Sequence, residues 1–293
     1  MDSSLSVIHQ YSEQTSNLWN FCFKSLHLCL ERKKSTRFMR RQVISRIQKE
    51  LETVASVKTK DWWEKYLKHE TPFRGVKMAD IRAVVNKEFS KQSETPEWKK
   101  ALAYDLIREE HSEDKLAGIL ILSEHIIDDL SLEKDLDALA LVFDEGYIRD
   151  WNICDWFCVK VMSKLAKNQG TSHWHRICAW KDAENQWRKR ASCVSFVNLA
   201  QELKPGSEET RMIFDMCHQV IQSPWRFHQT AVGWLLREIS KKKSMETHVV
   251  ELIKSNHDYF GDEALSYATR AMSASLKKVL LRSPRNKKKR PRT

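Results

Sequence analysis

The chain is poor in the two residues that most often break regular structure. It contains only seven glycines and six prolines among 293 residues. Sheet folds need such residues in their turns, so this scarcity disfavours a protein built mainly from strands. No alternating strand pattern with a hairpin signal occurs along the chain either. The composition favours an all-α protein, and the length allows one large domain or two small ones.

Cysteine pairs of the CxxC type are also absent. The seven cysteines form an odd, scattered set without a CxxC pair, and most lie in apolar helical runs. This pattern is typical of a reducing compartment, where thiols are buried as small hydrophobic side chains. Cys154 and Cys158, followed by His175 and Cys178, are a weaker alternative as zinc ligands. Structural zinc sites usually join their ligands across tight loops, so core packing is the preferred interpretation.

Several familiar nucleotide-binding and hydrolytic motifs are missing. The chain has no GxGxxG, no P-loop, no HExxH and no GxSxG. Each of these patterns builds a known phosphate, metal or nucleophile site. Their absence removes the commonest nucleotide-dependent and hydrolase interpretations.

A hydrophobic run long enough to cross a bilayer is absent as well. The apolar segment 17–30 is too short and contains Lys24 and His27. It lacks a basic leading region and a small-residue cleavage site, so we expect neither secretion nor a membrane partner. Asp2 and Glu13 count against an organelle transit peptide, although organelle targeting stays open.

Positive charge is concentrated at one end of the chain. The formal net charge is +11, and the final twelve residues, RSPRNKKKRPRT, contain seven of these positive charges and no acid. The rest of the chain therefore has a net charge of only +4. The basic segment 285–292 is typical of a nuclear-localisation or nucleic-acid-contacting tail, and also of a solvated disordered end. We expect a nuclear protein, with the cytoplasm as a further location.

Apolar residues recur at helical spacing along most of the chain. Leu102, Leu106 and Ile107 share one face of the helix predicted to begin at Pro96. Thr95-Pro96 and Ser223-Pro224 are helix-start signals, and such punctuation predicts roughly a dozen helices with short loops. Helix pairs stacked at a spacing of ~40 residues describe a curved α-solenoid of HEAT-like repeats with a concave face.

This organisation divides the chain into three parts. Residues 1–36 are expected to be an N-terminal extension, either helical or disordered. Residues 37–281 are expected to form the HEAT-like repeat domain. Residues 282–293 are expected to be a disordered basic tail.

Two helices combine tryptophan with charged or glycine residues in unusual ways. Trp151 and Asp155 are four residues apart, so they share one helix face, and nothing obvious in the next turn neutralises the carboxylate. The pair either faces water or lines a cleft that takes something cationic. Gly233 precedes Trp234 in mid-helix, where glycine costs ~1 kcal/mol relative to alanine, so we expect a close packing contact there. Trp234 by itself is more often a core indole.

Four segments in order resemble the DNA alkylation repair enzyme family, whose AlkD-type members are DNA glycosylases built from HEAT-like repeats. They are FRGVKMADIR at 73–82, WNICD at 151–155, WRKRA at 187–191 and AVGWLLRE at 231–238. The resemblance runs from about Trp62 to Ala274, roughly three quarters of the chain. The sequence departs from the family pattern at Ala79, where proline is common, and in the residues that flank Asp155.

The resemblance implies a role for each matching residue. Asp155 would be the catalytic carboxylate, Trp151 and Trp234 would line the cleft, and Arg190 would hold the DNA backbone near the lesion. On this view Asp155 lacks a local salt-bridge partner, because its partner is the cationic substrate. Further backbone contacts are expected among Lys77, Arg82, Arg188 and Arg237, of which the last two are also plausible structural ion-pair partners.

The implied activity is hydrolysis of the N-glycosidic bond of N3- or N7-alkylated purines in double-stranded DNA. Such an enzyme is expected to be a monomer that needs neither a metal nor an organic cofactor. The alternative is a non-catalytic α-solenoid that binds damaged or branched DNA by its shape, since a fold does not by itself imply catalysis. A protein-binding scaffold, which would show a hydrophobic concave face, is a third interpretation.

Overall fold

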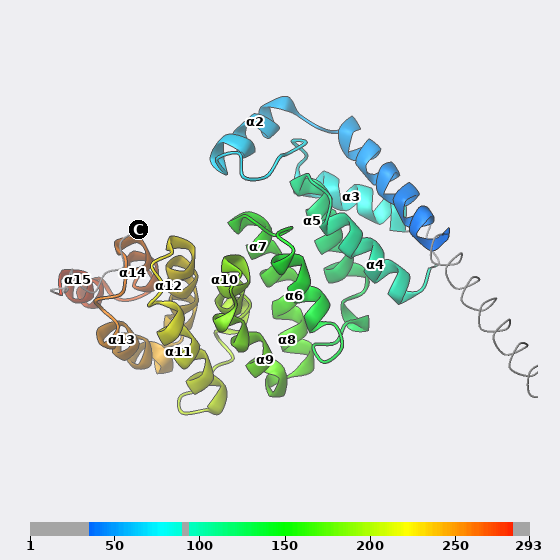
Figure 1. The fold of residues 1–293 in the computed structure, drawn as a ribbon. Coiled ribbons are helices and arrows are strands. Elements are labelled where there is room, and N and C mark those ends of the chain that lie inside the picture. The colour runs from blue at the N-terminus through cyan, green and yellow to red at the C-terminus, as the bar shows by residue number, and fades with distance from the viewer. Residues whose placement is uncertain (1–34, 90–93, 284–293) are drawn as a thin grey trace, which may run out of the picture. The chain divides into compact units, whose positions relative to one another are not determined.

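The computed structural model describes residues 35–89 and 94–283, and these residues form helices and no strands (Figure 1). The prediction of an all-α protein is therefore confirmed. The elements of the described part are a helical stretch at 35–53 and α2 (Val57–Tyr66), α3 (Met78–Phe89), α4 (Pro96–Ile107), α5 (Ser112–Leu120), α6 (Leu136–Asp144), α7 (Trp151–Phe157), α8 (Ser163–Gln169), α9 (Trp174–Cys178), α10 (Gln186–Val194), α11 (Glu208–Val220), α12 (Arg226–Ser240), α13 (Glu246–Ser255), α14 (Asp262–Ala268) and α15 (Ala274–Arg282).

The chain divides into two compact units, Met1–Lys49 and Glu50–Thr293. The described part of the first unit is the helical stretch 35–49. The second unit contains α2 to α15 and all the candidate site residues. Most of the expected extension 1–36 and the basic segment 285–292 lie outside the described residues, so both stay predictions.

Within the described part of the second unit, six helices form one continuous row. The contacts run in chain order from α3 to α5, α5 to α7, α7 to α10, α10 to α12 and α12 to α14, while α4, α11 and α13 pack against helices of this row (Figure 1). A row of helices in which each contacts the next, with partners packed beside it, is the arrangement of an α-solenoid. The predicted fold class is therefore confirmed.

The local signals behave largely as expected. Leu102, Leu106 and Ile107 are fully buried, and the Thr95 hydroxyl accepts a hydrogen bond from the backbone N–H of Trp98 at the start of α4. The start signal at Ser223-Pro224 is wrong by two residues. Helix α12 begins at Arg226, since the Ser223 hydroxyl accepts the backbone N–H of Trp225 and forms a turn before the helix.

Gly233 allows α12 and α14 to pack closely. A Cβ atom at this position would lie 2.5 Å from the backbone oxygen of Ala264 and 3.0 Å from the Cβ of Tyr267. Real Cβ contacts are almost never this short, so only glycine fits without a shift of one helix. The predicted close contact is confirmed, and it sets the position of the neighbouring Trp234.

No helix in the described ranges combines the length and apolar character that a bilayer crossing requires.

Candidate functional site

The start of α7 is anchored by a buried carboxylate. Asp150 accepts a hydrogen bond from the backbone N–H of Ile153 (2.9 Å) and another from the Thr71 hydroxyl (2.6 Å). Burial raises the pKa of Asp150, and these hydrogen bonds oppose that effect. Asp150 thereby connects α7 to the loop after α2 and fixes the first turn, which carries Trp151.

Asp155 pairs with an arginine on another helix, which corrects the expectation that its partner is the substrate rather than the protein. Arg190 of α10 donates from Nε to Oδ1 of Asp155 (2.8 Å) and from Nη2 to Oδ2 (2.9 Å). The guanidinium side chain is only 5% exposed, whereas the carboxylate side chain is 16% exposed. The sequence did not predict this pair because its members are 35 residues apart and lie on different helices. The two-pronged contact fixes both carboxylate oxygens and leaves part of the group open to solvent.

The same arginine also reaches α12. Its Nη1 donates to the backbone oxygen of Phe227 (2.5 Å) and to the Thr230 hydroxyl (3.3 Å). Burial of Arg190 opposes its charged form, but the charge and hydrogen bonds of Asp155 outweigh this effect and raise its pKa. Arg190 therefore joins α7, α10 and α12 at one point. In this position Arg190 orients the carboxylate of Asp155. Its contact with the DNA backbone stays a prediction.

Trp234 lies on the α12 surface that is next to this pair. Thr230, which touches Arg190, precedes Trp234 by one helical turn, so the two side chains share a face. The indole is half-buried, and the Arg237 guanidinium lies 6.0 Å from the centre of its ring. Trp151, one turn before Asp155 on α7, is half-buried too. Both indoles thus have accessible surface on helices that meet at Arg190.

A tyrosine that sequence reasoning missed extends this aromatic set. The ring of Tyr66, at the end of α2, meets Trp151 edge to face with 5.7 Å between the centroids. The segment WWEKYL, which contains Tyr66, marked the start of the family resemblance, but nothing in its spacing connects it to position 151. The contact exists because α2 and the first turn of α7 come together in the fold.

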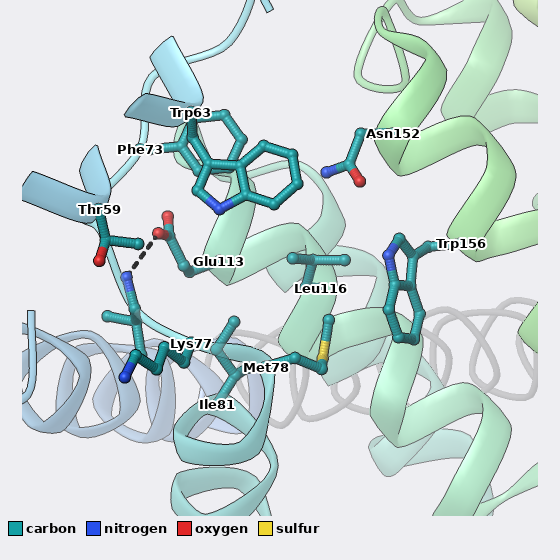
Figure 2. Close-up of a pocket in the computed structure, with 11 residues that line it drawn as sticks. Thr59, Trp63, Phe73, Lys77, Met78, Ile81, Glu113, Leu116, Asn152 and Trp156 are labelled. Atoms are coloured by element: carbon teal, nitrogen blue, oxygen red, sulfur yellow. Dashed lines mark hydrogen bonds between the residues drawn. The ribbon is translucent and has the colours of Figure 1, made fainter. Parts of the chain in front are cut away.

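A cavity of about 240 Å³ lies beside the site, between α2, α3, α5 and α7 (Figure 2). Trp63 enters it from α2 and Trp156 from α7, and Leu116 of α5 lies between them. Trp63 also stacks on Phe73, with centroids 5.5 Å apart. The wall is mainly apolar, and Asp155 is not part of it. Trp156 follows Asp155 directly, so the cavity lies on an adjacent face of the same helix.

The segment FRGVK is held by one buried carboxylate. Glu113, near the start of α5, accepts hydrogen bonds from the backbone N–H groups of Arg74, Gly75 and Val76, at 2.8 to 3.0 Å. Gly75 has a φ of +92°, and a Cβ there would lie 2.2 Å from the backbone oxygen of Ser56. This part of the family signature is therefore structural, because it holds the loop that leads from α2 to α3.

The four candidates for backbone contact are placed differently. Lys77 is exposed, and the described residues supply no acidic partner for it. The other three form ion pairs: Arg82 with Glu124, Arg188 with Asp144 and Arg237 with Glu238. Arg188 and Arg237 thus form the ion pairs that were the alternative to DNA contact, and Arg82 forms one as well. Their contacts with DNA stay predictions.

The described cysteines belong to the core. Cys154, Cys158, Cys178, Cys193 and Cys217 are all buried with free thiols. Burial raises the pKa of the Cys178 thiol to about 12, so this thiol is uncharged at neutral pH. Within residues 35–89 and 94–283, no group of three or more His, Cys, Asp and Glu side chains is arranged to hold a metal ion. Cys22 and Cys29 lie outside these ranges.

These observations define an α-solenoid in which a carboxylate is oriented by an arginine that contacts α12, with a half-buried indole on both α7 and α12. A family described as "DNA alkylation repair enzyme" matches residues 47–272, more than half of the chain. The protein belongs to the DNA alkylation repair enzyme family. Its fold is similar to that of a predicted DNA alkylation repair enzyme from Enterococcus faecalis, with a TM-score of 0.64 and 18% identity over 75% of this chain and 97% of the other. Comparison with curated protein sequences yields no significant match.

Proposed function

We propose that the protein is a monofunctional DNA glycosylase that hydrolyses the N-glycosidic bond of N3- or N7-alkylated purines in duplex DNA. The observation that carries this proposal is the geometry of Asp155. Its carboxylate is oriented by a buried arginine, partly open to solvent, and one helical turn from the half-exposed indole of Trp151. Membership in a DNA alkylation repair family supports DNA as the substrate.

The chemistry suits a carboxylate without a general acid. Alkylation at N3 or N7 makes the purine cationic, so the base leaves as a neutral molecule when the bond from C1′ to nitrogen breaks and its electron pair goes to the base. Positive charge then develops on the sugar. A carboxylate held in a fixed position stabilises that charge without reorganising, which is the main source of catalysis in many enzymes.

Hydrolysis is completed by one water molecule. It attacks C1′ of the cationic sugar and releases its proton, for which Asp155 is the nearest base in the proposed site. The neighbouring indole faces attract cations by ~0.5–2 kcal/mol, which favours an alkylated nucleotide over a neutral one. The proposed site contains no lysine nucleophile, so strand cleavage through a Schiff base is not part of this mechanism.

Arg190 has two opposing effects in this mechanism. Its two hydrogen bonds fix the carboxylate, which favours catalysis, but its positive charge offsets part of the negative charge that the transition state needs. This second effect favours the other candidate function, a solenoid that binds damaged or branched DNA by its shape and does not release the base.

Base release distinguishes the two candidates. The purified protein and an Asp155→Asn variant would be incubated with methylated duplex DNA, and free 3-methyladenine and 7-methylguanine would be measured. We expect release by the wild type and a loss of about a hundredfold or more in the variant, the usual effect of removing one strong transition-state contact. Release by neither protein, with tight DNA binding retained, would leave the shape-dependent binder.

Controls separate catalysis from folding, because the Asn variant leaves the buried Arg190 charge without its partner. Asp137→Asn, an exposed carboxylate on α6, should leave base release unchanged. Asp155→Glu keeps the charge and should retain more activity than the Asn variant if charge stabilisation is the role of this side chain. Thermal unfolding of each variant shows whether the fold is intact.

We further propose that the protein acts as a monomer in the nucleus, with the basic segment 285–292 as the nuclear address. Seven positive charges and no acid within the last twelve residues support this proposal. A variant truncated after Leu281 tests this proposal. Loss of nuclear accumulation would indicate a nuclear-localisation signal, and loss of salt-dependent DNA affinity would indicate a segment that binds DNA.

A further inference from the structure

Helix α2 has an outer face whose aromatic rings are not part of any core. None of its residues is buried, and Trp62 and Tyr66 are 57% and 55% exposed. Their rings stack on each other with centroids 4.9 Å apart and an angle of 22° between the planes. Large aromatic side chains usually contribute their area to a core or an interface, so two stacked, exposed rings indicate a binding surface.

Lysines lie on the same face. Lys58 precedes Trp62 by one turn and Lys65 follows it by three residues, so both exposed lysines border Trp62 on the side away from Tyr66. Asp61 borders this face, so the charges here are two positive and one negative. We call Lys58, Trp62, Lys65 and Tyr66 the α2 platform. Flat aromatic rings beside cations are the combination that binds single-stranded nucleic acid.

The α2 platform is continuous with the candidate site. Tyr66 contacts Trp151, and Trp151 lies one helical turn from Asp155. The edge of α2 next to Tyr66 faces the protein, since Trp63 and Thr59 line the cavity beside α7. A polynucleotide bound at Asp155 would therefore pass next to Tyr66 and Trp62 on one side of the site.

We propose that the α2 platform binds an unpaired nucleotide of the DNA substrate that flanks the position of the damaged base. The base of this nucleotide stacks on the exposed part of the Trp62 ring, while Lys58 and Lys65 contact the neighbouring phosphates. This inference rests on the proposed function only in taking DNA as the ligand. A docking surface for a protein partner is the competing explanation, and it predicts no dependence on DNA structure.

The test compares three DNAs that differ only in an unpaired end. Fluorescently labelled, undamaged duplexes, blunt or extended by a four-nucleotide single strand at the 5′ or the 3′ end, would be titrated with the protein and followed by anisotropy. We expect at least one extension to tighten binding about fivefold or more, as stacking of one base provides. Trp62→Ala should abolish this difference and leave the affinity for the blunt duplex unchanged.

Matched variants keep the test independent of folding. Val57→Ala changes the most exposed hydrophobic side chain of the same helix and should keep the full preference, whereas Trp62→Phe should keep most of it. Lys58→Ala and Lys65→Ala should each reduce the salt dependence of binding to the extended DNA. Equal affinity of the wild type for all three DNAs, or a preference that survives Trp62→Ala, would overturn the proposal.

The outcome is separate from that of the glycosylase proposal. If methylated DNA releases no base but the extended duplex still binds more tightly through Trp62, the platform stands and the glycosylase activity fails. If base release depends on Asp155 while Trp62→Ala changes no DNA affinity, the activity stands and the platform fails.

Discussion

Asp155 and Arg190 are 35 residues apart in the sequence and share two hydrogen bonds of 2.8 and 2.9 Å. Each oxygen of the carboxylate has its own donor, so rotation of the group would break a contact. The arginine is itself fixed by the Phe227 backbone and the Thr230 hydroxyl. The direction of the carboxylate is therefore set by α10 and α12 together, and not by its own helix.

Arg190→Lys tests this orientation. Lysine keeps the charge but cannot make the two parallel hydrogen bonds, so we expect the base-release rate to fall about tenfold or more and the free energy of unfolding to fall by about 1–3 kcal/mol. Arg226→Lys is the matched control, because Arg226 makes the same kind of pair with Glu263 on an exposed surface. That change should cost less than about 1 kcal/mol in a urea titration. Equal effects of both changes would contradict the special role of Arg190.

Gly233→Ala should push α12 and α14 apart. Its methyl group would meet the Ala264 backbone oxygen at 2.5 Å, and this atom cannot move without its helix. We expect a loss of about 1–3 kcal/mol in the free energy of unfolding, despite the better helix propensity of alanine. Thr247→Ala on the exposed surface of α13 should change it by about 0.5 kcal/mol or less. A stabilised Gly233→Ala variant would show that the close packing is absent in solution.

Glu113→Gln should loosen the loop that connects α2 to α3. The carboxylate accepts three backbone N–H groups, whereas an amide has one acceptor oxygen and presents its NH₂ group to the other donors. We expect a loss of about 1–3 kcal/mol in stability and faster limited proteolysis near residues 71–77. Glu124→Gln, which weakens only a partly exposed pair with Arg82, is the control and should leave the cleavage rate unchanged.

The stability of the protein should depend on pH through His228. This side chain is fully buried between the Ser223 hydroxyl and the backbone oxygen of Gln186, and burial lowers its pKa from 6.5 to about 4. The unfolded chain then binds the proton more readily between pH 6.5 and 4, so stability is full above 6.5 and falls as the pH drops to about 4. The loss from this residue is about 3 kcal/mol.

A His228→Gln variant isolates this effect, because glutamine can keep both hydrogen bonds but does not titrate. Urea titrations of both proteins at several pH values give the difference in free energy of unfolding. The free energy of unfolding of the wild type should fall relative to that of the variant as the pH falls from 6.5 to 4. A difference that is constant across this window would show that His228 titrates normally in the folded protein.

Lys77→Ala should weaken DNA binding about uniformly across sequences and reduce the slope of log affinity against log salt by about one, as the loss of one phosphate contact does. Arg82→Ala should change the slope less, because Arg82 is paired with Glu124 in the free protein. Binding of an undamaged duplex at four salt concentrations measures both slopes. A larger change for Arg82 would mean that this ion pair opens when DNA binds.

The helical architecture could be read from the sequence because its causes are local. Scarce glycine and proline, helical spacing of Leu102, Leu106 and Ile107, and the Thr95-Pro96 start signal each act within a turn or two of the chain. The close packing contact at Gly233 could also be predicted, since a glycine in mid-helix destabilises the helix and packing must offset that cost. The start of α12 was misplaced because Ser223 forms a local turn before the helix.

The sequence predicted a set of candidate site residues but not their arrangement. The sequence alone determined that Trp151 and Asp155 share a helix face, because four residues make about one turn. Only the tertiary structure decided that Arg190 pairs with Asp155, that Glu113 holds the FRGVK segment and that Tyr66 meets Trp151. Each of these contacts joins helices that are neighbours only after the solenoid has stacked, and no local preference of the chain encodes which side chains then meet.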